Sequence, residues 1–156
     1  DMISSYLSGG KSSVLYKKLI DEKKEALTVQ AVNIGQVDYN IFALFALPIG
    51  DVSLDTLLAD MDEEIVKMQN ELISERDYEK LLNQFESDFV SSNSSVAGIA
   101  GSLATYYLLY GDVNIINNQL DTYRSITREE IQSVAKKYLN PNQRVEVQYL
   151  PKKDDQ

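Results

Sequence analysis

The glycine-rich stretch near the start of the chain contains residue types that could bind a phosphate group. Residues 9–13 read GGKSS, which resembles the end of the phosphate-binding motif G-x-x-x-x-G-K-[ST]. That motif needs a glycine at position 5, where this chain has Ser5, and a strand before the loop. The preceding residues have helical spacing instead, so a glycine break followed by a helix capped by Ser12 or Ser13 explains the same residues. A phosphate-binding module is therefore the third of three functional hypotheses.

A second group with possible chemistry is an acidic run, which suggests a cation site. Asp60, Asp62, Glu63 and Glu64 supply carboxylates within five positions. Consecutive positions of a helix point in different directions, so these groups do not converge on one ion. Because residues of an apolar stripe flank them, we expect all four on the outward, solvated face of a helix.

The residue types that most often bind zinc or transfer protons near neutral pH are missing. The 156 residues include no His and no Cys, which excludes the usual general base, thiol nucleophiles, disulfides and zinc–cysteine sites. Catalysis by this chain alone would have to use Asp, Glu, Lys, Tyr or Ser. The sequence therefore predicts that the chain is not an enzyme by itself, and it leaves the redox compartment open.

Length and charge limit the organisation and the partners. A chain of 156 residues, of which 44% are hydrophobic, is expected to form one domain, here residues 1–150, followed by a polar tail over residues 151–156. The net charge of -9 disfavours binding to nucleic acid or to an anionic membrane, and no apolar run is long enough for membrane insertion. Helical spacing already begins at Met2, so we interpret the chain as an N-terminally incomplete domain of a longer protein.

Two strands are predicted near the start of the chain. Residues 28–34 alternate in polarity, and residues 39–49 read YNIFALFALPI, which is almost entirely apolar. The four residues between them suit a hairpin connection, so the pair is expected to be antiparallel. A nearly continuous apolar run is typical of a strand buried on both faces.

Helical periodicity dominates the rest of the chain. Apolar residues recur at helical spacing over residues 54–72 and 78–89, Gly111 is a candidate C-cap, and Thr127 with Glu130 forms a capping box. Residues 144–150 then alternate strictly and predict a closing strand. This order predicts an α+β fold in which helices cover one face of an antiparallel sheet.

The most specific pattern lies in residues 6–29. Residues 6–19 read YLSGGKSSVLYKKL and residues 26–29 read ALTV, which resembles the signature L-x-G-G-x-S-S-R-L-Y-x-x-L-R-E-x-x-x-L-A-Y-S-V that opens the second domain of insulinase-like (pitrilysin) zinc peptidases. Residues 83–89, NQFESDF, are similar to the N-Q-x-x-x-x-F helix of that family, and residues 127–141 to its T-x-E-D-V-x-x-V-A-x-K-Y-L-x-P segment. The resemblance covers nearly the whole chain and implies the metallopeptidase fold shared with mitochondrial processing peptidase.

The same resemblance implies that the catalytic groups are absent from this chain. Members of the family bind zinc through an H-x-x-E-H helix and a downstream Glu of another domain, so zinc is expected in the catalytic domain of the parent and not here. Second domains of the family often supply an Arg and a Tyr that polarise the substrate carbonyl. The matching positions are Ile20 and Leu27, and the Arg of the S-S-R-L element is replaced by Val14. No residue of this chain is therefore predicted to be catalytic.

The resemblance implies a non-catalytic domain of an insulinase-like zinc metalloendopeptidase that forms scaffold and wall of the peptide-binding chamber. Gly9, Gly10, Ser12 and Ser13 are the candidate chamber residues. The expected partners are a peptide substrate and the zinc-bearing domain, in the same parent or in a partner subunit. Family analogy suggests a periplasmic or otherwise extracytoplasmic location.

The alternative hypothesis is a scaffold or assembly subunit of a family member that has lost peptidase activity. An H-x-x-E-H motif upstream in the parent would favour the peptidase, and its absence would favour the scaffold.

Overall fold

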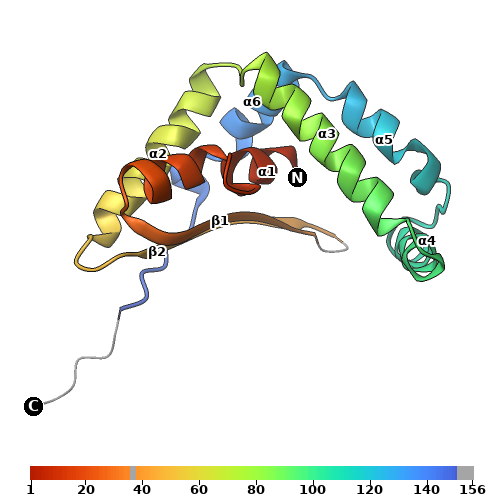
Figure 1. The fold of residues 1–156 in the computed structure, drawn as a ribbon, viewed down its shortest axis with the longest axis horizontal. Helices are drawn as coiled ribbons and strands as arrows, with labels where there is room; N and C mark the ends of the chain where they lie inside the picture. Colours follow the sequence, from red (N-terminus) through yellow and green to blue (C-terminus); the bar gives the residue numbers. More distant parts are fainter. Residues whose placement is uncertain (36–37, 151–156) are drawn as a thin grey trace, which may run out of the picture.

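A computed structural model describes residues 1–35 and 38–150, which form a two-stranded sheet with helices stacked on one side of it (Figure 1). The elements are, in order, α1 (Met2–Ser8), η1 (Tyr16–Glu22), β1 (Ala26–Gly35), β2 (Asn40–Pro48), α2 (Leu54–Asn70), α3 (Glu75–Ser92), α4 (Val96–Tyr110), α5 (Ile115–Ser125), α6 (Arg128–Tyr138) and η2 (Pro141–Gln143). The predicted polar tail, residues 151–156, lies outside the described residues. Among the helices of the described ranges, none combines the length and apolar character that crossing a membrane requires.

The two strands form the predicted antiparallel hairpin. Ala31 of β1 pairs with Leu44 of β2, and a β-bulge lies between Ala26 and Thr28. Because side chains alternate along a strand, Ala31 and Leu44 point to the same face of the sheet, where they meet the core cluster. The neighbouring positions point to the opposite face.

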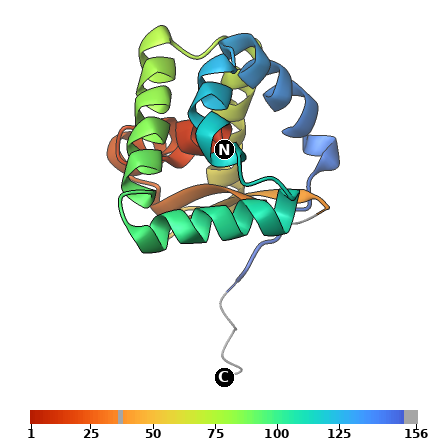
Figure 2. The same ribbon diagram turned by 90° about the vertical axis from the view of Figure 1, so that its right-hand side faces the viewer.

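The helices pack on the inner face of this hairpin. Three leucines, Leu7, Leu15 and Leu19, are fully buried between the sheet and the surrounding helices. The predicted apolar stripe of α2 is also confirmed, since Leu57 and Met68 near its two ends are buried. The α+β fold with helices over one face of the sheet is therefore confirmed (Figures 1 and 2).

Two helices begin or end at capping residues that the sequence predicts. The Thr127 hydroxyl accepts a hydrogen bond from the Glu130 amide, and the Glu130 carboxylate accepts one from the Thr127 amide, which completes the capping box of α6. Gly111 closes α4 in the left-handed conformation, with φ of 70°. Ser13 differs from the prediction, because its hydroxyl donates back to the Gly10 carbonyl oxygen and caps no helix.

The predicted closing strand over residues 144–150 is wrong. Within the part of the chain that the structure describes, this segment has no strand beside it, and a strand requires a neighbouring edge for its backbone hydrogen bonds. Two polar contacts to α2 hold the segment instead. Arg144 lies 2.5 Å from the Asp62 carboxylate, and Gln148 donates to Asp55 at 3.1 Å. Val147 on the other side of the segment is left exposed.

Candidate functional site

The glycine–serine loop between α1 and η1 is held by its own bonds. A Cβ at Gly9 would lie 2.4 Å from the Ser5 carbonyl oxygen, so only glycine fits there. Gly10 adopts a φ of 96°, a conformation that favours glycine. Ser13 is buried, and its hydroxyl lies 2.7 Å from the Gly10 carbonyl oxygen that it donates to. These contacts fix a tight turn at the end of α1.

Ser12 connects the same loop to a distant helix. The Lys80 ammonium group of α3 lies 3.2 Å from the Ser12 carbonyl oxygen and 3.3 Å from its hydroxyl. The structure thus brings Gly9, Gly10, Ser12 and Ser13 together in one turn, which follows α1 on the side of the sheet that the helices cover (Figure 1). That the turn faces a peptide chamber stays a prediction.

The two positions that match the family's Arg and Tyr are aliphatic side chains on neighbouring elements. Ile20 of η1 is half-buried and packs against the core, whereas Leu27 lies beside the bulge of β1 with 65% of its surface exposed. Neither side chain can donate a hydrogen bond or carry charge. This pair therefore cannot polarise a carbonyl group.

The acidic run on α2 does not lie wholly in solvent, which corrects the prediction. Asp60 is only 7% exposed, and the Glu64 side chain is also largely buried, whereas the Glu63 side chain is about half exposed. Asp60 follows Leu57 by three positions and Glu64 follows Asp60 by four, so both carboxylates lie beside the buried stripe of the helix. Two of the four acidic side chains are therefore buried enough to need partners.

Asp60 meets two residues from the turn that leads into β1. The Lys23 ammonium group lies 2.6 Å from Asp60 Oδ1. Asp60 Oδ2 and Glu25 Oε2 are both buried and receive no hydrogen bond from any donor of the described residues. One proton shared between the two carboxyl groups would satisfy both oxygens.

The pKa shifts of this carboxyl pair agree with one shared proton. The hydrogen bond to Asp60 is the main cause that raises the pKa of Glu25 above its usual 4.5. Burial by itself raises the pKa of Asp60, but hydrogen bonds from Lys23 and Glu25 and the charges of Lys23 and Lys18 outweigh it, so the pKa of Asp60 is lowered. Sequence reasoning missed the pair because Glu25 and Asp60 are far apart in the chain and share no motif.

A second charge network occupies the rest of the acidic run. Lys18 lies 2.6 Å from Glu63 and 3.1 Å from Glu64, and Lys67 contacts the same two carboxylates at 3.1 and 2.8 Å. The hydrogen bond to Glu64 is the main cause that raises the pKa of Lys67, and the hydrogen bond to Glu63 adds to it. The carboxylates of this network are thus already paired with ammonium groups.

Zinc does not fit the residues of this chain. The sequence has no His and no Cys, and the described residues contain no group of three or more potential ligands placed to hold a metal ion. Structural and catalytic zinc sites use three or four such ligands. No catalytic step is therefore assigned to zinc within this chain.

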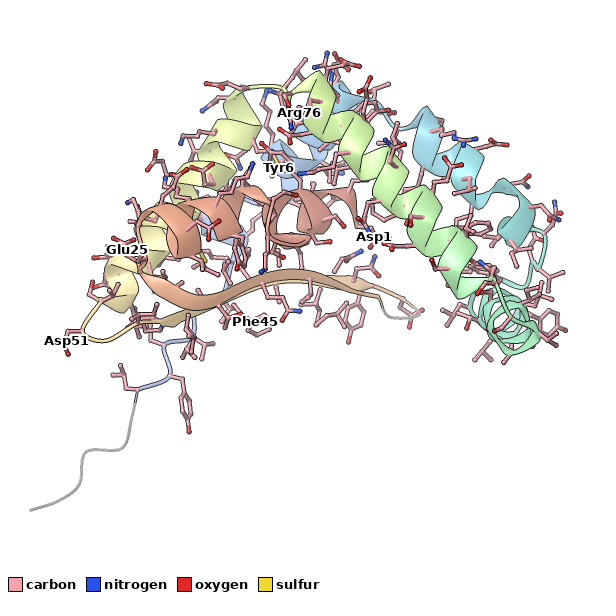
Figure 3. All side chains as sticks on the ribbon, in the orientation of Figure 1. Asp1, Tyr6, Glu25, Phe45, Asp51 and Arg76 are labelled. Carbon is pink, nitrogen blue, oxygen red and sulfur yellow. The ribbon has the colours of Figure 1, made fainter. Side chains whose placement is uncertain are left out.

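The outer face of the hairpin is the largest departure from the sequence prediction. The apolar β2 was expected to be buried on both faces, but Ile41, Phe45 and Leu47 on its outer face are exposed. Phe45, with 56% of its surface exposed, lies on the side of the sheet away from the helices (Figure 3). No described residue covers this face. A strand with the composition of two buried faces thus leaves one of them free for another molecule or domain.

Comparisons with known proteins agree with this arrangement. The family model described as "Peptidase M16 inactive domain" matches residues 1–85. Zinc protease PqqE of Helicobacter pylori is 25% identical over 151 residues, which are 97% of this chain but only 34% of that protein. The chain thus spans about a third of the length of this curated relative.

Two solved structures have the same fold. A protease from Helicobacter pylori superposes with a TM-score of 0.84 at 24% identity, over 92% of this chain and 34% of that one. The inactive peptidase domain of a protein assigned as a zinc protease, from Bordetella parapertussis, gives a TM-score of 0.85 at 20% identity, over 100% of this chain and 82% of that one. The family model covers more than half of this chain and confirms the resemblance found in the sequence. The chain therefore belongs to the M16, or insulinase-like, peptidase family, and it corresponds to the domain that the family model describes as inactive.

Proposed function

We propose that this chain is a non-catalytic domain of a zinc-dependent peptidase and that it forms scaffold and wall of a chamber for peptides. The observation that carries the proposal is the uncovered apolar face of β2, around Phe45. An apolar sheet face that no described residue covers is the kind of surface that binds peptide side chains or packs on another domain. Ile20 and Leu27 in place of polar groups support a role in binding and not in catalysis.

The zinc site of this proposal belongs to the rest of the parent. The relative PqqE is described as a zinc protease, and about two thirds of its length has no counterpart in this chain. The catalytic zinc, its ligands and the water that it activates are therefore assigned to that remainder. The proposed partners are the zinc-bearing domain and a peptide substrate. This chain contributes apolar contacts that orient the peptide and a fold that supports the chamber.

Within the proposed chamber, Gly9, Gly10, Ser12 and Ser13 are retained as candidate lining residues. Gly9, Gly10 and Ser12 are exposed, and Ser12 is the one of these three with a side chain; its carbonyl oxygen accepts a hydrogen bond from Lys80. Replacing Ser12 by a bulky residue such as Trp tests the assignment. A raised KM for peptide cleavage by the parent would support a lining role, and an unchanged KM would contradict it.

Cleavage of a quenched fluorescent peptide tests the proposed function. The assay compares this chain alone, the remainder of the parent alone and the two together, each with zinc. We expect cleavage by the mixture, faster than by the remainder alone, and none by this chain. Cleavage by this chain alone that a chelator abolishes would contradict the proposal. A folded complex with no cleavage in any case would instead favour the alternative, a scaffold subunit without peptidase activity.

A further inference from the structure

Helix α4 is the most exposed apolar element among the described residues. None of its residues from Val96 to Tyr110 is buried, although the helix is rich in large apolar side chains. Val96 is 86% exposed and Leu108 is 82% exposed. Figure 1 places α4 at the end of the fold opposite α2, and Figure 2 shows it crossing in front of the sheet.

One side of α4 is attached to the fold and the other is free. Tyr106 and Leu103 are half-buried, and the Tyr106 hydroxyl is hydrogen-bonded to the Gln119 side chain of α5. A helix turns by about 100° per residue, so Leu108 lies nearly opposite Tyr106 around the helix, and the flank between them carries Val96 and Tyr107. Both of these side chains are exposed. The helix is thus held in place by α5 while it presents an apolar face outward.

The charge pattern separates this face from the rest of the surface. From Phe89 to Gly111 the sequence contains no Asp, Glu, Lys or Arg, whereas the whole chain has a net charge of -9. Monomeric soluble proteins rarely expose a continuous apolar patch larger than roughly a few hundred Å². Permanent interfaces are more apolar than transient ones and exclude charged residues from their centre. The α4 face therefore has the composition of a permanent interface.

We propose that the outward face of α4, formed by Val96, Tyr107 and Leu108, packs against the zinc-bearing remainder of the parent. This inference rests on the proposed function, which assigns that remainder as the partner. About two thirds of the relative PqqE lies outside the region that this chain matches, which leaves ample protein to cover the face. A second copy of this chain is a poorer occupant because it would bring together two molecules of charge -9. The same charge disfavours an anionic membrane.

A single cysteine on α4 tests the inference without disturbing the fold. Because the chain has no Cys, Leu108→Cys introduces its one thiol at an exposed position. The rate of labelling with a maleimide is measured in the chain and in the full-length parent, with peptide mapping to identify the site. Val66→Cys is the matched control, since Val66 lies exposed among the charged residues of α2.

We expect labelling at Leu108→Cys to be about tenfold or more slower in the parent than in the chain, and labelling at Val66→Cys to be equal in the two. Equal labelling at Leu108→Cys would overturn the inference. Protection that already appears in the chain, and grows with its concentration, would also overturn it and would identify a second copy as the occupant.

The same parent preparation is assayed for peptide cleavage. An active parent with an unprotected Leu108→Cys contradicts only the docking surface, and an inactive parent with a protected one contradicts only the proposed peptidase.

Discussion

At the scale of single residues, the carboxyl pair of Glu25 and Asp60 is the feature that the structure adds to the sequence. Sequence spacing places Asp60 in an acidic run and predicts a solvated position for it. The helix instead turns Asp60 toward Lys23 and Glu25. The helical period of α2 could be predicted, but the partner across the fold could not, because only the tertiary arrangement of β1 and α2 defines it.

This pair predicts a pH-dependent contribution to stability. The pKa of Glu25 is raised in the folded state, so protonation of this carboxyl group stabilises the fold. The stabilisation is fully present below 4.5, the pKa in the unfolded chain, and it is lost as the pH rises through the pKa of the folded state. Glu25→Gln keeps a donor toward Asp60 at every pH. The variant should therefore become more stable relative to the wild type as the pH rises.

Urea unfolding of both proteins from about pH 4 to about pH 8 measures this difference. The lowered pKa of Asp60 gives an opposite loss of stability below 3.8, which both proteins share to first order. A difference in unfolding free energy that does not change with pH would show that Glu25 and Asp60 do not share a proton in solution.

Glycine 9 allows a second test at the residue scale. Gly9→Ala places a methyl group 2.4 Å from the Ser5 carbonyl oxygen, so it should destabilise the fold by about 1–3 kcal/mol. Gly101→Ala is the matched control, because a Cβ there meets nothing within 4 Å, and alanine should stabilise α4 by about 1 kcal/mol. Thermal or urea unfolding measures both changes. Equal effects of the two substitutions would contradict the described turn.

At the scale of elements, local signals predicted most helices and the hairpin. Caps such as Thr127 and Gly111 act on their own backbone neighbours, so they can be recognised without knowledge of the fold. The closing strand over residues 144–150 could not be predicted in this way, because its alternation gives a strand only where another strand lies beside it. The free face of β2 was missed for the same reason, since apolar composition does not tell whether a covering layer is present.

The capping box of α6 predicts a local stability effect. Thr127→Ala removes the hydroxyl that accepts a hydrogen bond from the Glu130 amide at 3.1 Å, so the free energy of unfolding should fall by about 1 kcal/mol. Thr127→Ser keeps the acceptor and should restore nearly all of that loss. If urea unfolding shows that the serine variant is as destabilised as the alanine variant, the hydroxyl is not the cause.

At the scale of the whole molecule, the chain has two apolar surfaces that no described residue covers. The outer face of β2 is assigned to the peptide chamber, and the outward face of α4 to the contact with the zinc-bearing remainder. Membership of the family could be predicted from motifs that run through the chain. The two surfaces could not, because a bare apolar face is a property of the packed structure.

Phe45→Glu in the full-length parent tests the central assignment most directly. Phe45 lies exposed on the outer face of the sheet, so the substitution should leave folding unchanged while it weakens contact with an apolar peptide. We predict that KM for a quenched fluorescent peptide rises by about tenfold, that kcat changes little, and that Val66→Glu on α2 alters neither value. Unchanged kinetics for Phe45→Glu, with the parent active and folded, would contradict the assignment of this face as the chamber wall.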